Sequence, residues 1–236
     1  MAPGPLALVG GDELKSGNEP QDRILIEAAG DGPAYVIATA AARQRPDLAV
    51  ANAQRWFGTL GLEVVELPLT KRSQATSEDI AARAREGRFF YLVGGDPGLV
   101  PKVLADSFAW DAIAEAWRAG AALAGSSAGA MALGSWTLIR DRMPGDDRRR
   151  YRDALGLVPN VAVVPHLSTF GERWIPSALD AAPEAVILLG IDERTAAVFV
   201  DGSWRVEGQG SVVVVTARGR TSFGPGEEIV GLPTPA

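Results

Sequence analysis

Short apolar runs alternate with helix-like segments along the first half of this sequence, and that alternation limits the possible folds more than any other feature. Most of the runs end at a glycine or another turn-forming residue, as buried strands do. They cover residues 6–9, 35–38, 62–67, 89–93 and 121–124. Repeated strand–helix–strand units predict an α/β fold, with a mostly parallel sheet and helices on both of its faces.

The segments between the expected strands carry helix signals. A first helix is expected over residues 47–59, directly after Pro46. A second is expected to begin with a capping box at Thr76 and Asp79 and to end near Gly87. On a third helix, one apolar stripe at helical spacing is formed by Trp110, Ile113 and Trp117.

The second half of the chain has a different pattern. Residues 161–164 and 185–189 still have the composition of buried strands. From Ala196 onward, apolar runs flank the pair Asp201-Gly202, which is typical of a hairpin between antiparallel strands. The sequence therefore predicts antiparallel strands at the C-terminal edge of the sheet. We expect one domain over residues 1–236, with a weakly ordered tail from about residue 224.

Composition excludes several kinds of site and partner. The chain has no cysteine and a single histidine, which excludes disulfides, thiolate zinc sites, cysteine nucleophiles and metal sites built from several imidazoles. We therefore expect neither a metal nor a cofactor. The formal net charge of −6 argues against binding to nucleic acid. Because no apolar run could span a membrane and the first residues lack a secretory pattern, we expect a cytoplasmic monomer or homodimer without membrane contact.

The most informative motif is Gly-Ser-Ser-Ala-Gly at residues 125–129, a G-x-S-x-G pattern between an expected strand and a helix-forming segment. A tight turn of this kind strains the backbone of its central residue, so the neighbouring residues must be small. In this register Ser127 is the candidate nucleophile, and the amide of Ala128 points to the place where oxyanion charge develops. The alternative is that these small residues only allow a helix to pack closely on a strand.

A serine nucleophile needs a base, and the single histidine is the one imidazole available. His166 follows the expected strand at 161–164, and the ends of parallel strands are where active sites gather. A carboxylate should then orient the imidazole. Asp192 and Glu193 follow another buried run, and Asp141, after the motif helix, is a further candidate for this role.

Two glycine-rich loops follow expected strands. Residues 94–96 read Gly-Gly-Asp, and glycines at such a turn let backbone N–H groups approach a ligand closely. A phosphate-binding loop is the competing interpretation, but no Lys-Ser/Thr pair follows. Residues 10–12, also Gly-Gly-Asp, form a similar but weaker signal. The charged segment at 140–153 is expected to be a solvated loop, with a substrate-closing lid as the alternative.

Together these segments resemble the serine peptidase family that contains cyanophycinase and dipeptidase E (aspartyl dipeptidase). The matching stretches, in order, are residues 93–96, 125–130, 165–166 and 190–196. The resemblance implies a flavodoxin-like fold of the class I glutamine amidotransferase type. It also implies that Ser127 is the nucleophile, His166 the base and Glu193 the acid, while dipeptidase E-like members keep Asp141 as the alternative acid. Gly95 and Ala128 are then the oxyanion donors.

The substrate side departs from the cyanophycinase-like pattern. Pro97 stands where those members usually have Gln, Pro165 precedes the histidine, and the one arginine shortly after it is Arg173. We therefore expect hydrolysis of short peptides, including dipeptides with an N-terminal Asp, rather than of β-aspartyl-arginine polymer. The candidate substrate-binding residues are Asp96, Ser126 and Arg173. Ester hydrolysis by the same triad, or non-catalytic binding of a small molecule, are the alternative functions.

Overall fold

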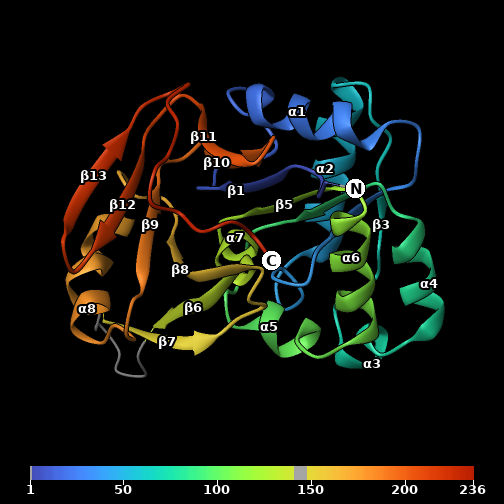
Figure 1. The fold of residues 1–236 in the computed structure, drawn as a ribbon. Helices are drawn as coiled ribbons and strands as arrows, with labels where there is room; N and C mark the ends of the chain where they lie inside the picture. The colour runs from blue at the N-terminus through green and yellow to red at the C-terminus, as the bar shows by residue number, and fades with distance from the viewer. Residues whose placement is uncertain (1, 141–147) are drawn as a thin grey trace.

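Two β-sheets form the framework of the protein (Figure 1). The computed structural model describes residues 2–140 and 148–236, so the candidate acid Asp141 lies outside the described residues. The strands of the larger sheet are β1 (Leu6–Val9), β2 (Ala34–Ile37), β3 (Val65–Glu66), β4 (Phe89–Leu92), β5 (Ala122–Ser126), β10 (Thr195–Val200) and β11 (Ser203–Gly208). Their order is β11-β10-β1-β5-β4-β2-β3. Strand β10 pairs in antiparallel orientation with both β1 and β11, and the other neighbouring pairs are parallel.

The smaller sheet follows the motif helix in the sequence and lies on the left in Figure 1. Its strands are β6 (Gly134–Arg140), β7 (Arg149–Asp153), β8 (Val158–Val164), β9 (Ile187–Ile191), β12 (Val212–Thr216) and β13 (Gly219–Phe223). The order is β13-β12-β9-β8-β6-β7, with a parallel centre and antiparallel strands at both edges. The sequence predicts strands of both kinds but not their division between two sheets.

Helices cover both faces of the larger sheet because its strands are apolar on both sides. They are α1 (Glu19–Ala29), α2 (Pro46–Thr59), α3 (Arg72–Ala75), α4 (Glu78–Glu86), α5 (Leu99–Leu104) and α6 (Phe108–Arg118). In β4, Phe89 and Tyr91 pack in the cluster that contains α1 and α2 residues, whereas Phe90 and Leu92 pack in the cluster that contains α4 and α6 residues. This alternation follows from the two-residue period of a strand. The predicted α/β class, with antiparallel strands after the parallel ones, is confirmed.

The short helix α7 (Ala128–Leu133) joins the two sheets. It follows β5 directly, and its side chains are all buried, with Ala128 and Met131 at 1% and 2% exposure and Ala130 at 0%. The residues Ala130 to Leu133 belong to the same apolar cluster as residues of β1, β5, β6 and β8. A helix packed on all sides holds its N-terminus, and the residue before it, in a defined place.

Three local predictions are corrected by the structure. Helix α4 begins after Ser77, because Thr76 ends α3 and donates its N–H to the carbonyl of Arg72 at 3.1 Å. The charged segment at 140–153 is not a loop throughout, since β7 pairs with β6 along its described part. Tyr151 of this strand packs edge-to-face against Trp136, which gives the charged strand an apolar side. The strand expected over residues 62–67 is present only as the two-residue strand β3.

The remaining elements are the 3₁₀ turn η1 (Gly171–Trp174), helix α8 (Ile175–Asp180) and the C-terminal segment. We expected the tail to be weakly ordered, but it makes backbone contacts with the body of the protein. The amide of Ile229, which is buried, donates to the carbonyl of Trp204 at 2.7 Å. The amide of Ala236 donates to the carbonyl of Leu157 at 2.9 Å.

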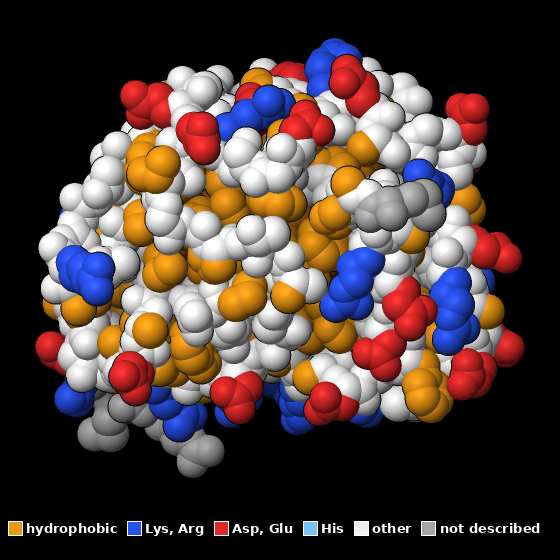
Figure 2. All heavy atoms as spheres, in the orientation of Figure 1, with side chains coloured by type: hydrophobic (Ala, Val, Ile, Leu, Met, Phe, Trp, Pro, Cys, Tyr) orange, Lys and Arg blue, Asp and Glu red, His pale blue; other side chains and the backbone are white. Residues whose placement is uncertain are grey.

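The surface carries charges of both signs. In the space-filling view, acidic and basic side chains lie mainly around the edge of the face, while hydrophobic side chains show in its middle (Figure 2). Among the described residues, no helix has the length and apolar character needed to cross a bilayer.

Candidate active site

Ser127 occupies a strained turn between β5 and α7. Its φ and ψ angles are 49° and −110°, outside the regions that a serine ordinarily adopts. The turn also requires glycine on both sides. A Cβ atom on Gly125 would lie 2.5 Å from the backbone of Gly129, and one on Gly129 would lie 2.2 Å from the carbonyl oxygen of Leu92. The G-x-S-x-G spacing is therefore a packing requirement of this elbow.

The structure brings Ser127, His166 and Glu193 into one hydrogen-bonded chain. Ser127 Oγ lies 3.0 Å from Nε2 of His166, and Nδ1 of the same ring lies 2.7 Å from Oε1 of Glu193. The imidazole is largely buried, with 19% of the side chain exposed, and the Glu193 side chain is 33% exposed. A neutral imidazole that donates its Nδ1–H to the carboxylate presents the Nε2 lone pair to the hydroxyl.

His166 is held by contacts on several sides of its ring and backbone. It follows β8, adopts a positive φ of 52°, and donates its N–H to the carbonyl of Gly10 at 2.7 Å. The ring lies against Gly11, where a Cβ atom would come within 2.2 Å of the ring carbon Cε1. On another side it stacks on Phe170, with ring centroids 4.7 Å apart. The imidazole therefore has little freedom to leave its position.

Of the two adjacent acids after β9, only Glu193 contacts the imidazole. Asp192 accepts the backbone N–H of Ser168 at 3.0 Å and that of Ser211 at 2.9 Å, and so joins neighbouring loops. The following residue, Arg194, donates its N–H to Gly11 O at 2.9 Å and its side-chain Nε to Asp12 Oδ2 at 2.6 Å. These bonds hold the Glu193 turn against the loop after β1.

The pKa of Asp12, in the loop after β1, departs from its ordinary value. Partial burial opposes ionisation, but hydrogen bonds and charge from Lys15 and Arg194 outweigh it and lower the pKa of Asp12 below 3.8. The carboxylate therefore stays ionised near neutral pH and keeps its ion pair with Arg194.

The loop after β4 lies beside the nucleophile. A Cβ atom on Gly94 would be 3.3 Å from Ser127 Cβ, and the amide of Gly94 donates to Glu13 Oε1 at 2.9 Å. The next amide, on Gly95, has no hydrogen-bond acceptor within the part of the chain that the structure describes, and the same is true of the Ala128 amide. These are the two amides expected to hold an oxyanion, and the loop that carries one of them is fixed by Glu13.

The predicted substrate-binding residues do not gather at the triad. Ser126 is fully buried, and Ala122 and Ala124, which lie on the same face of β5, belong to the cluster that contains α1 and α2 residues, so its hydroxyl does not reach the active-site surface. Arg173 is exposed in η1. Asp96 accepts the N–H of Gly98 at 2.9 Å and lies 3.9 Å from Arg43, at the edge of a cavity.

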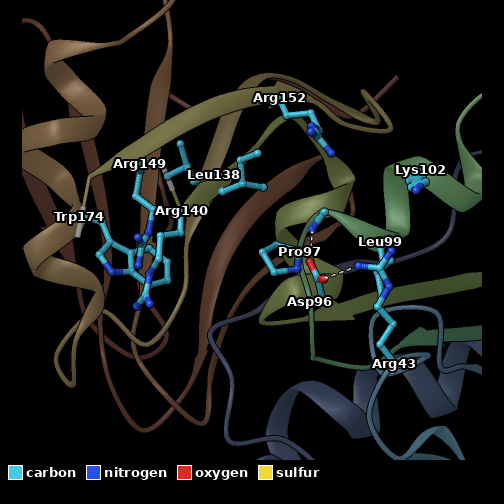
Figure 3. A pocket seen from close by; sticks show the side chains of 12 residues that line it. Arg43, Asp96, Pro97, Leu99, Lys102, Leu138, Arg140, Arg149, Arg152 and Trp174 are labelled. Atoms are coloured by element: carbon cyan, nitrogen blue, oxygen red, sulfur yellow. Dashed lines mark hydrogen bonds and ion pairs between the residues drawn. The ribbon is translucent and has the colours of Figure 1, made fainter. Parts of the chain in front are cut away.

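This cavity has a volume of about 460 Å³ and an unusual lining (Figure 3). Among the described residues, its wall contains five basic side chains and one acidic side chain, Asp96. The basic residues are Arg43, Lys102, Arg140, Arg149 and Arg152. The guanidinium of Arg149 lies over the ring of Trp174, 4.0 Å from its centroid. We refer to this feature as the basic cavity.

The residues that support the site carry no recognisable signal in the sequence. Glu13, Asp12 and Arg194 act on the triad only through loops, and no motif marks such contacts. The Gly-Gly-Asp sequence at 10–12 predicts a loop that approaches a ligand, whereas in the structure this loop contacts His166 and Arg194. The basic cavity draws its cations from separate elements, so no local pattern could have revealed it.

The chemistry that the site can perform is nucleophilic. A hydroxyl, an imidazole and a carboxylate in series can generate an alkoxide-like nucleophile, and two unengaged amides can stabilise an oxyanion. Within residues 2–140 and 148–236, no three acidic or histidine side chains cluster as a metal site would require.

Comparison with known proteins places the chain among peptidases. The model of peptidase family S51 matches residues 6–206. The chain is 32% identical over 215 residues to the cyanophycinase of Trichormus variabilis, covering 88% of this chain and 72% of that protein. It is 28% identical over 217 residues to the cyanophycinase of Synechococcus elongatus, covering 89% of this chain and 67% of that protein.

Solved structures give a consistent result. The crystal structure of a peptidase from an acI-B1 Actinobacterium superposes with a TM-score of 0.84 and 29% identity, covering 96% of each chain. A putative peptidase E protein from Listeria monocytogenes EGD-e superposes with a TM-score of 0.57 and 18% identity, covering 94% of this chain and 99% of that one, which supports the fold alone.

Proposed function

The chain belongs to peptidase family S51 and is a serine-type peptidase, and from this premise we propose that it hydrolyses short peptides through Ser127, His166 and Glu193. The family resemblance drawn from the sequence motifs is confirmed by these comparisons. The assignment of the three roles, the oxyanion donors and the substrate is our proposal.

One observation carries the proposal. The hydroxyl, imidazole and carboxylate lie in series, with separations of 3.0 Å and 2.7 Å, on a strained elbow beside a glycine-rich loop. A serine that merely allowed close packing would need neither a histidine nor a carboxylate in line with it. Distances in this range allow proton transfer without rearrangement.

The proposed reaction proceeds in two halves. In the first, His166 Nε2 takes the proton of Ser127 Oγ as the oxygen attacks the peptide carbonyl, while Glu193 stabilises the imidazolium that forms. The amides of Gly95 and Ala128 hold the oxyanion. The imidazolium then gives its proton to the leaving amine, and an acyl-enzyme remains on Ser127. In the second half, the same imidazole activates a water that releases the acid product.

The substrate class that we propose is short peptides, including dipeptides with an N-terminal Asp. Three features support it: the Pro-His pair at 165–166, the Pro at position 97 in place of Gln, and the absence of an arginine cluster directly after the histidine. Ester hydrolysis by the same machinery remains the competing reaction, and it uses the same acyl-enzyme.

The test is a kinetic comparison of the wild type with Ser127→Ala, His166→Ala and Ser126→Ala on Asp-X dipeptides and on p-nitrophenyl esters. The first two variants should lose about 10⁴-fold or more in kcat/KM, by analogy with other serine triads. Ser126→Ala is the matched control, because it removes a neighbouring hydroxyl that lies outside the triad, and it should retain most activity. Near-normal turnover by Ser127→Ala would rule out the mechanism, and esters hydrolysed far better than any peptide would favour the competing reaction.

A further inference from the structure

An aromatic ring, that of Phe170, stacks on the imidazole that we propose as the base. The centroids of the Phe170 and His166 rings are 4.7 Å apart, and the two ring planes are inclined by 23°. At this angle the phenyl group presents its π face, rather than its edge, to the imidazole. The face of an aromatic ring carries partial negative charge and therefore attracts a cation that lies over it.

The chain between the two rings fixes their relative position. The N–H groups of residues 169–171 all donate to the carbonyl of His166, at 3.1, 3.0 and 2.8 Å. Gly171 is buried, and a Cβ atom on it would lie 2.4 Å from the carbonyl oxygen of Pro165, so the turn requires glycine there. This closed turn places Phe170 against the imidazole through backbone contacts that do not depend on a substrate.

A second aromatic side chain supports the Phe170 ring. Trp174, at the end of η1, lies with its ring centroid 5.4 Å from that of Phe170, and the ring planes are inclined by 50°. Both side chains are half-buried. Phe170 therefore contacts two rings, and its place on the imidazole is defined by its side chain as well as by its backbone.

The carboxylate of the triad and the phenyl ring approach the imidazole from different directions. Glu193 Oε1 lies 2.7 Å from Nδ1, and among the described residues it is the one charged group that bonds to the ring. The other ion pairs of the surrounding loops join Asp12 to Lys15 and Arg194, and Glu172 to Arg220. A positive charge on the imidazole would therefore meet a carboxylate at one nitrogen and a π face on one side of the ring.

That positive charge arises during the proposed reaction. His166 Nε2 takes the proton of Ser127 Oγ, and the ring stays charged until it gives this proton to the leaving amine. A π face attracts the imidazolium more strongly than the neutral imidazole, and an interaction that strengthens toward the transition state raises the rate. We propose that Phe170 is a positioning residue that stabilises the imidazolium form of His166 through its π face. This inference rests on the proposed function.

The burial of the imidazole sets the expected size of the effect. With 19% of the His166 side chain exposed, water shields the charge only in part. A cation–π contact in such a setting changes a rate by about threefold to 30-fold. Loss of the contact should lower kcat and leave KM nearly unchanged, because the charge is absent while the substrate is merely bound.

The first experiment weakens the π face while nearly preserving the shape of the side chain. Phe170 is replaced, through nonsense suppression, by phenylalanine with one, two or three ring fluorines, and the rate constant for phosphonylation of Ser127 by a fluorophosphonate is measured. Fluorine withdraws electron density from the π face, so the rate constant should fall stepwise, by about threefold to 30-fold with three fluorines. The same series at Phe199 is the control and should leave the rate unchanged, since Phe199 pairs with Leu6 at the end of β1 that lies away from the triad. A flat series at Phe170 would overturn the inference.

The second experiment compares Phe170→Leu with Phe170→Tyr on Asp-X dipeptides. Phe170→Leu should lower kcat about threefold to 30-fold, whereas Phe170→Tyr keeps the π face and should stay within about threefold of the wild type. A rise in KM with kcat and the phosphonylation rate unchanged would overturn the inference, because Phe170 would then be a substrate contact only.

The His166→Ala variant separates this inference from the proposed function. In that background, Phe170→Leu should not change the residual rate further, because the charge that the ring stabilises no longer forms. An inactive His166→Ala variant together with a flat fluorine series would overturn the inference and leave the proposed function standing. Near-normal turnover by His166→Ala would overturn both.

Discussion

Asp22 offers a quantitative test of how this fold tolerates a buried acid. It lies on α1 with 0% exposure, and its Oδ2 accepts the indole N–H of Trp56 at 2.7 Å. Its Oδ1 has no hydrogen-bond partner among the described residues. Burial raises the pKa of Asp22 from 3.8 to about 7; the bond from Trp56 opposes the rise, and the negative charges of Glu19 and Glu13 add to it.

The raised pKa sets the sign and size of the effect on stability. Between about pH 4 and pH 7 the folded protein keeps a proton on Asp22 that the unfolded chain has lost, so the free energy of unfolding falls as the pH rises through this range. Above pH 7 the loss is complete. It amounts to about 4 kcal/mol, because each pH unit between the two pKa values contributes about 1.4 kcal/mol.

The variant Asp22→Asn removes the titration while its side-chain oxygen can still accept from Trp56. We expect its melting temperature to exceed that of the wild type by roughly 12 °C at pH 8 but only roughly 5 °C at pH 5, from about 2–4 °C per kcal/mol for a chain of this size. The assay is calorimetric melting across this pH range. Asp47→Asn, which alters an exposed carboxyl on α2, is the control and should show no comparable gain. A gain that is absent, or equal at both pH values, would refute the reasoning.

Two further predictions concern the elbow and the oxyanion loop. Gly129→Ala should destabilise the protein by about 1–3 kcal/mol, because its Cβ would lie 2.2 Å from Leu92 O. The control Gly58→Ala, in open space on α2, should instead stabilise the protein by about 0.5–1 kcal/mol. Equal shifts in the melting temperatures of the two variants would argue against the packing account. Glu13→Ala should lower kcat about tenfold to 100-fold with KM nearly unchanged, because the Gly94 amide loses its acceptor. Glu13→Gln keeps an acceptor and should recover most of that rate, and a failure of this rescue would contradict the positioning role.

Much of the elbow could be predicted from the sequence because its requirements are local. Gly125 and Gly129 are needed where backbones approach closely, and their spacing around Ser127 is visible without a structure. The proximity of His166 to Glu193 followed from a more general rule, that the ends of neighbouring parallel strands meet at one edge, whereas Ser127 follows β5 of the other sheet. The family resemblance then assigned their roles.

The parts that could not be predicted depend on contacts between distant segments. Helix α7 packs between the two sheets, and its short apolar sequence does not predict that the strands divide there. The charged strand β7 is stabilised by an aromatic contact from Tyr151 to Trp136 and by pairing with β6, and its composition resembles a loop. Ser126 was expected to line the substrate site, but the alternation along β5 buries it on the opposite side.

The central claim is that Ser127 is a nucleophile activated by His166, and active-site labelling tests it most directly. The protein is treated with a fluorophosphonate, digested, and the modified residue is identified by tandem mass spectrometry. We predict one phosphonylated residue, Ser127, with labelling abolished in His166→Ala and preserved in Ser126→Ala. No labelling of the folded wild type, or labelling of Ser127 that does not depend on His166, would contradict the account.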